Sequence, residues 1–211
     1  GSEMCIRDSD YSMSVKEFAG MLKRYGIDLS ILEEGTFDEP LGESTGAADI
    51  FGNTGGVMEA VVRNASLIAT NEFPRTIEFH GVFGLQNAKE AYVRLGEKTL
   101  HLLVVSGLGN ARKVLEEIRQ GKSHYDAIEI MACPGGCING GGQPILDTYT
   151  RREVDYKALR AKALYDEDAK SKIRKSHDNP VVQDVYKTYL GEPGSHKAHE
   201  ILHTSYVNRK I

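Results

Sequence analysis

Short apolar runs alternate with one helical pattern in the middle of the chain. Residues 77–82 and 100–106 predict buried strands, because both runs are too short for a typical helix. Residues 111–119 predict a helix that Gly121 can end. Residues 127–131 predict the next strand. A strand, a helix and a strand of these lengths form a βαβ unit, whose strands are normally parallel. The apolar face of this helix comprises Ala111, Val114, Leu115 and Ile118.

Helical spacing also occurs on both sides of this unit. Ser14 and Glu17 form a capping box for a helix that Gly26 can end. Residues 27–46 predict an irregular connection. Beyond Pro144, three further segments have helical spacing: 154–166, 180–190 and 196–203.

A glycine-rich loop over residues 47–56 runs into a predicted helix over residues 57–70. Such a loop directs backbone N–H groups and the positive end of a helix dipole at whatever lies before it. A phosphate or nucleotide site is the obvious alternative. The loop lacks both a Gly-Lys-Ser/Thr ending and a GxGxxG motif after a clear strand, which disfavours nucleotide binding.

These patterns predict an α/β fold: a βαβ-containing lobe with a parallel sheet, followed by a C-terminal helical extension. We expect the lobe to span residues 10–150 and the helical extension residues 151–211. Residues 1–9 show no periodicity, so we expect them to be extraneous to the fold or disordered, and Cys5 to have no role.

Composition narrows the class of protein. The 211 residues carry a net charge of -4, with a pI near 6.0, which argues against a nucleic-acid partner. Mean hydropathy is -0.37 and no apolar run approaches twenty residues, so we expect no membrane span. Three cysteines, two of them in one loop, do not resemble a disulfide framework. We therefore expect a reducing, cytoplasmic location.

The stretch Met131-Ala-Cys-Pro-Gly-Gly-Cys-Ile-Asn-Gly-Gly-Gly-Gln-Pro144 carries the clearest chemistry. Cys133 and Cys137 follow a predicted strand directly, and thiolates are the preferred ligands of iron-sulfur clusters. Gly135 and Gly136 have no Cβ atom, so the backbone there can approach a bulky inorganic group. Because open α/β sheets bind ligands at the carboxyl ends of strands, this loop predicts an iron-sulfur site.

The same stretch resembles the last cysteine motif of iron-only (FeFe) hydrogenases. Further blocks support the resemblance in the family's order: residues 40–46, Phe51-Gly-Asn-Thr-Gly-Gly-Val-Met-Glu-Ala60, His80-Gly81, and residues 190–200. The last block is similar to the family's small-subunit-like segment. Together the blocks cover the chain from about residue 10 to its end.

The resemblance implies an H-cluster, in which a four-iron, four-sulfur cube is joined through a cysteine sulfur to a diiron subcluster. By motif position Cys133 would bind the cube, and Cys137 would bind the cube and bridge to the diiron unit. Met131 would pack against that unit, with Phe51 and Gly52 lining the pocket beside it. The implied reaction is the reversible reduction of protons to dihydrogen, with ferredoxin or a NAD(P)-linked subunit as electron partner.

The family also has two earlier cysteine motifs, of Cys-Cys-Pro and Met-Pro-Cys type, which supply the other cube ligands and a proton-relay cysteine. Neither occurs in these 211 residues. We therefore expect the C-terminal portion of a longer hydrogenase, with weak cluster binding and no turnover by this chain alone. The alternative is a non-catalytic iron-sulfur binding or sensory module that reuses the lobe.

A second metal hypothesis comes from the last predicted helix. His196, His199 and His203 fall on one helical face, with Glu200 nearby, and could imitate a zinc site. Because the family resemblance runs through this segment as a structural element, packing or capping roles are the favoured interpretation.

Overall fold

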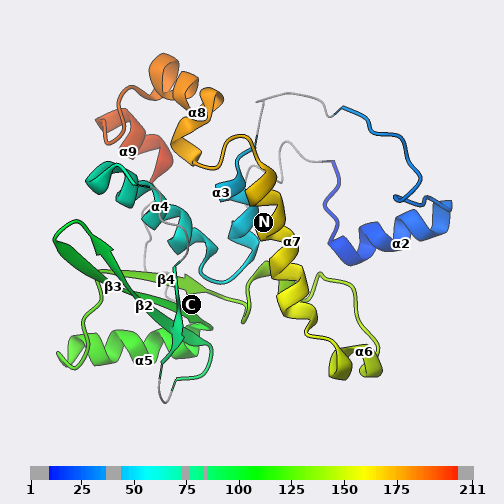
Figure 1. Ribbon diagram of the computed structural model, residues 1–211, viewed down its shortest axis with the longest axis horizontal. Helices are drawn as coiled ribbons and strands as arrows, with labels where there is room; N and C mark the ends of the chain where they lie inside the picture. Colours follow the sequence, from blue (N-terminus) through cyan, green and yellow to red (C-terminus); the bar gives the residue numbers. More distant parts are fainter. Residues whose placement is uncertain (1–9, 37–43, 73–76, 83–84, 204–211) are drawn as a thin grey trace, which may run out of the picture.

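A four-stranded sheet carries helices on both of its faces (Figure 1). The computed structural model describes residues 10–36, 44–72, 77–82 and 85–203. Residues 1–9, for which we expected no part in the fold, lie outside the described residues. The strands are β1 (His80–Gly81), β2 (Ala88–Leu95), β3 (Lys98–Ser106) and β4 (Ala127–Met131), and this is also their order in the sheet.

The predicted βαβ unit is confirmed. Strand β3 pairs with β4 in parallel, and α5 (Leu108–Arg119) connects them. Strands β1 and β2 add antiparallel pairs, so among the described residues the parallel pairing of this α/β fold is confined to β3 and β4. Gly121 takes a positive φ of 69° just beyond α5, as the sequence predicts for its end.

Strand β2 was not predicted, although it forms a long hairpin with β3. A two-residue loop joins Leu95 to Lys98, and Gly96 in that loop has a φ of 60°. The predicted strand over residues 77–82 is shorter than expected, because only His80 and Gly81 pair with β2. Ile77 and Phe79 instead pack against the core beneath α4 (Gly56–Thr70).

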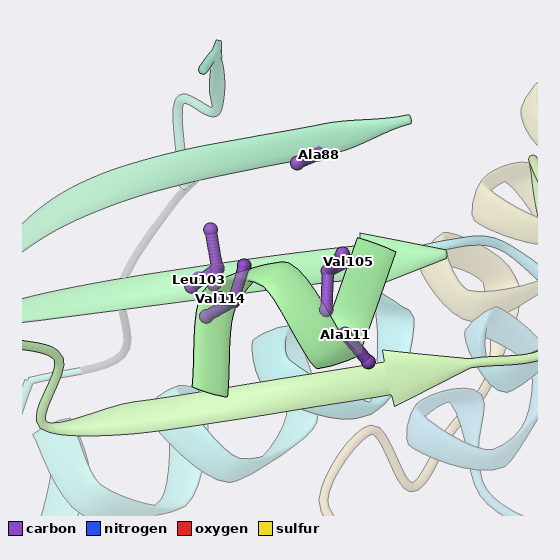
Figure 2. Close-up of a cluster of buried hydrophobic side chains, with 5 residues drawn as sticks. All are labelled: Ala88, Leu103, Val105, Ala111 and Val114. Carbon is purple, nitrogen blue, oxygen red and sulfur yellow. The ribbon is translucent and has the colours of Figure 1, made fainter. Parts of the chain in front are cut away.

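The side chains of β3 alternate between two apolar layers. Leu103 and Val105 pack against α5, in a cluster with Ala88, Ala111 and Val114 (Figure 2). Each fully buried aliphatic side chain of this kind stabilises the fold by about 1.5–3 kcal/mol. Of the four residues predicted to form the apolar face of α5, Ala111 and Val114 are buried, whereas Leu115 is 45% exposed.

The second layer lies on the opposite face of the sheet, beneath α4 (Gly56–Thr70). Leu102 and Val104 of β3 pack there against Met58 and Val62. Helix α4 confirms the helix predicted over residues 57–70. The glycine-rich stretch before it is more regular than predicted, because α3 (Gly46–Asp49) and the 3-10 turn η1 (Ile50–Gly52) occupy most of it.

Helix α2 (Val15–Tyr25) opens the described part of the chain. Its capping box is formed as predicted: the Ser14 hydroxyl accepts from Glu17 N, and the Glu17 carboxylate accepts from Ser14 N. Gly26 ends the helix with a φ of 66°. None of the helix's residues is buried, and Figure 1 shows α2 apart from the sheet.

The predicted C-terminal helical extension is present and begins earlier than its sequence pattern. Its longest helix, α7 (Tyr156–Lys170), packs against α3 and η1. The other elements are α6 (Thr148–Glu153), the 3-10 turn η3 (Ser176–Asp178), α8 (Pro180–Val185), the π-helical turn η4 (Tyr186–Leu190) and α9 (His196–Leu202). No helix within the described ranges is both long and apolar enough to cross a bilayer.

Candidate functional site

The cysteine loop begins where the parallel strands end. Met131, the last residue of β4, lies opposite Ser106 of β3, and its carbonyl accepts from Gly107 N at 2.7 Å. Cys133 and Cys137 follow as free, exposed thiols, and Cys137 begins the 3-10 turn η2 (Cys137–Asn139). The loop therefore stands at the carboxyl edge of the sheet, as the sequence predicts.

Two glycines give this loop its shape. Gly135 and Gly136 have φ values of 85° and 86°, which favour glycine. Gly136 N donates to Cys133 O at 3.0 Å. A Cβ on Gly136 would lie 2.5 Å from Gly52 O and 2.8 Å from Thr54 N. The structure thus brings two predicted site glycines, Gly52 and Gly136, into close backbone contact.

Polar side chains hold the rest of the loop. Arg160 of α7 donates to Ile138 O at 2.8 Å and to Pro144 O at 3.2 Å. Gln143 Nε2 donates to Cys137 O at 3.3 Å, and Asn139 Nδ2 donates to Pro134 O at 2.9 Å. Carbonyls between the two thiols and after them are therefore fixed by contacts within the protein. No sequence pattern pointed to Arg160.

Glu129 fixes the neighbouring loop and was also missed. From β4 its carboxylate accepts from Gly55 N at 2.8 Å and from Met58 N at 2.7 Å, at the N-terminus of α4. A carboxylate is favourable there because of the helix dipole. Glu129 could have been identified from the sequence, because a charged residue interrupts the apolar run of β4 there. Because the Glu129 carboxylate already accepts from these N–H groups, they are not available to bind a phosphate, which argues against the nucleotide site considered above.

Phe51 and Met131 flank this arrangement. Phe51 precedes Gly52 in η1 and is 41% exposed, whereas Met131 is half-buried at the end of β4. Neither is a fully buried core residue. Their shared role as an apolar wall beside a diiron unit remains a prediction.

The chemistry of the donor set fits half of a four-iron cube, which takes four cysteine ligands. Cys133 and Cys137 are two exposed thiols on a loop whose glycines allow close approach. Elsewhere in the described ranges, no three His, Cys, Asp or Glu side chains gather as a metal site would require. His199 and His203, considered above for zinc, contact each other at 3.0 Å between their Nδ1 atoms.

The chain matches two family models in succession. Residues 2–141 match the model described as "Iron only hydrogenase large subunit, C-terminal domain". Residues 154–209 match the model described as "Iron hydrogenase small subunit".

Two curated relatives match nearly the whole chain. The NADP-reducing hydrogenase subunit HndD of Solidesulfovibrio fructosivorans is 45% identical over 96% of this chain and 34% of its own length. Iron hydrogenase 1 of Clostridium pasteurianum is 41% identical over 95% of this chain and 35% of its own length. The chain thus spans about a third of the length of these relatives.

A further relative is named for iron-sulfur assembly and not as a hydrogenase. Cytosolic iron-sulfur assembly component 3 of Bos taurus is 27% identical over 95% of this chain and 41% of its own length.

Among solved structures, a variant of the [FeFe]-hydrogenase HydA1 from Chlamydomonas reinhardtii superposes with a TM-score of 0.69 and 38% identity. The match covers 90% of this chain and 54% of that one. Fold, cysteine loop and matched regions agree, and the chain belongs to the iron-only hydrogenase family.

Proposed function

We propose that the chain is the C-terminal part of an iron-only hydrogenase catalytic domain. Cys133 and Cys137 would hold a four-iron, four-sulfur cube as thiolate ligands, and Cys137 would also hold the diiron subcluster. Residues outside these 211 supply the other cube ligands. The observation that carries this proposal is the exposed thiol pair on a glycine-shaped loop at the carboxyl end of β4. When bound, the H-cluster would supply the reversible reduction of protons to dihydrogen.

The residues around the thiols position and shield this site. Gly135 and Gly136 let the backbone approach the cluster, while Gly52 accommodates the loop from the other side. Met131 and Phe51 exclude water from the diiron unit, because their side chains are apolar and compete weakly as ligands.

We also propose that the chain consists of two functional segments. Residues 10–150 form the lobe that carries the thiols, and residues 151–211 form the small-subunit-like extension. Electrons come from a ferredoxin or a NAD(P)-linked subunit. The name of the Solidesulfovibrio relative, a NADP-reducing hydrogenase subunit, supports the second partner class. We propose a cytoplasmic location on the basis of the cysteine content.

A second candidate is an iron-sulfur binding, sensory or assembly module without hydrogen chemistry. The relative named for cytosolic iron-sulfur assembly favours it. So does the donor set, because two exposed thiols fit a cluster that is held weakly and can be passed on.

Anaerobic reconstitution with iron and sulfide separates the two candidates. The chain is tested alone and with an added polypeptide that carries the two earlier cysteine motifs, and a diiron mimic and a dihydrogen assay follow. We expect a labile cube with the chain alone, a stable cube in the mixture, and dihydrogen after the mimic is added. A stable cube without hydrogen chemistry would overturn the catalytic proposal and favour the second candidate.

Thiol variants test the ligand assignment within the same experiment. C133S and C137S should each lower the iron retained after gel filtration. C5S is the matched control, since it removes the remaining cysteine of the chain, and it should retain iron like the unmodified protein. Equal iron retention in all three variants would contradict the assignment.

A further inference from the structure

Helix α2 separates its side chains by polarity and buries none of them. The apolar side chains lie within one half of the helical circumference: Val15, Phe18, Ala19, Met21, Leu22 and Tyr25. The other half carries the charged side chains: Lys16, Glu17, Lys23 and Arg24. Phe18, in the middle of the apolar face, is 42% exposed, and Tyr25 is 76% exposed. The helix therefore presents an apolar face that the described residues leave largely uncovered.

The apolar surface continues in the sequence beyond the helix. Four further side chains there are between 40% and 79% exposed: Ile27, Leu29, Ile31 and Leu32. Exposed apolar side chains are ordinary when they are scattered singly, but a large set of them marks an interaction site. A helix of eleven residues is also marginal in water on its own, and packing of its apolar face normally stabilises it. We therefore expect a partner to cover α2.

One end of α2 is attached to the thiol loop. Lys16 N, in the first turn of the helix, donates to Gly142 O at 2.9 Å. A Cβ on Gly142 would lie 3.1 Å from Ser14 Cβ, so the two segments are in close contact there. Gly142 follows Cys137 in the same glycine-rich stretch. A partner that covers α2 is therefore brought next to the loop that carries both thiols.

The thiol loop is incomplete in the same way as α2. Cys133 and Cys137 provide two of the four ligands that a cube takes, and they are the only cysteines among the described residues. In the family the other ligands come from two cysteine motifs that stand earlier in the sequence than the matched blocks. Helix α2 is the first described element of this chain. A polypeptide with these motifs would thus supply both a cover for α2 and ligands beside the thiol loop.

We propose that the apolar face of α2 and residues 27–32 form the docking surface for the polypeptide that carries the two earlier cysteine motifs. This inference rests on the proposed function, since it takes that polypeptide as the source of the other cube ligands. Docking does not require the cluster, because the surface consists of apolar side chains and includes neither thiol. The contact between Lys16 and Gly142 then holds the thiol loop beside the docked polypeptide.

Binding without iron tests the surface apart from the cluster. The metal-free 211-residue chain is titrated with the polypeptide under anaerobic, reducing conditions, and calorimetry measures the affinity. F18D should weaken binding at least tenfold, because it places a carboxylate in the centre of the apolar face. G20D is the matched control: it adds the same charge to the polar half of α2, where the Cβ position has open space. Both variants should keep the Tm of the chain alone, since α2 buries no residue.

The outcomes distinguish this inference from the proposed function. Binding that F18D weakens and G20D preserves would support the docking surface, even if reconstitution then gives no cube and no dihydrogen. Equal affinities of F18D, G20D and the unmodified chain would overturn the surface, whereas a stable cube in the same mixture would leave the proposed function standing. No binding without iron would also overturn it. Self-association that F18D abolishes, without binding of the polypeptide, would assign the face to a second copy of this chain and refute the proposal.

Discussion

Arg63 of α4 and Asp168 of α7 form a buried, bidentate ion pair across 105 positions of sequence, with N–O distances of 2.9 and 2.8 Å. Their side chains are 3% and 1% exposed. Arg63 also donates to Glu59, and Arg174 donates to Asp168. This cluster joins the region that matches the large-subunit family model to the region that matches the small-subunit model.

Removing the charge of Asp168 should destabilise this junction strongly. In D168N, Arg63 stays buried with one carboxylate fewer, and breaking a buried ion pair from one side costs about 3–5 kcal/mol. The matched control is D166N on the same helix, whose half-exposed carboxylate pairs with Lys162 and should contribute less than about 1 kcal/mol. Urea denaturation measures both values. Similar losses in the two variants would contradict a special role for the buried pair.

Acid should weaken the same junction. Burial alone would raise the pKa of Asp168, but hydrogen bonds and charges from Arg63 and Arg174 outweigh it and hold the pKa below the ordinary value of 3.8. A carboxyl with a depressed folded-state pKa contributes its full stability above the unfolded-state pKa and loses it as the pH falls further. The stability difference between wild type and D168N should therefore shrink below about pH 4. A difference that stays constant from neutral pH to pH 3 would refute this.

Tyr165 should show the opposite dependence at alkaline pH. Burial, followed by the charge of Glu59 and the hydrogen bond to its carboxylate, raises the pKa of Tyr165 to about 12. A raised folded-state pKa means that the contribution is present below the ordinary value of 10 and is lost as the pH rises towards 12. Near-ultraviolet absorbance of ionised tyrosine should show a titration near pH 12 that disappears in Y165F. If that titration persists in Y165F, it belongs to another of the ten tyrosines.

Gly136 should be far less tolerant of alanine than Gly141. G136A introduces a Cβ 2.5 Å from Gly52 O at a φ of 86°, and such backbone strain costs about 1–3 kcal/mol before the clash is counted. Gly141 has open space around its Cβ position. We expect G136A to lose stability and retained iron after reconstitution, while G141A keeps both. Equal behaviour of the two variants would show that contact with residues 52–54 does not shape the site.

The elements that sequence predicted well are those with strong local signals. The capping box of α2 spans only four residues of sequence, and the helix of the βαβ unit has a clear apolar period. Strand β2 was not predicted, because its buried positions are Ala88 and Ala91, which are weak strand formers. The charged residues Lys89 and Glu90 lie between them. Leu115 is exposed although it belongs to the predicted apolar face, because periodicity gives the direction of an apolar face but not how far the covering layer extends.

In the candidate site, too, only the features with a local sequence signal could be predicted. Cys133, Cys137 and the loop glycines could be identified from residue type and spacing, and their position at the end of β4 followed from the βαβ unit. The contact between Gly136 and residues 52–54 depends on chain segments far apart in sequence, and so do the hydrogen bonds that Glu129 accepts and Arg160 donates. Local patterns carry no information about such pairings.

Arg160 gives α7 a second attachment. One end of this helix is anchored through Asp168, and nearer its start Arg160 donates to Ile138 O, inside the turn that begins at Cys137, and to Pro144 O, downstream of that turn. A small rotation of α7 about its anchor would change the direction of those carbonyls and with it the spacing of the thiols. Substitutions along α7 can therefore change the geometry of the thiol loop without replacing any cysteine.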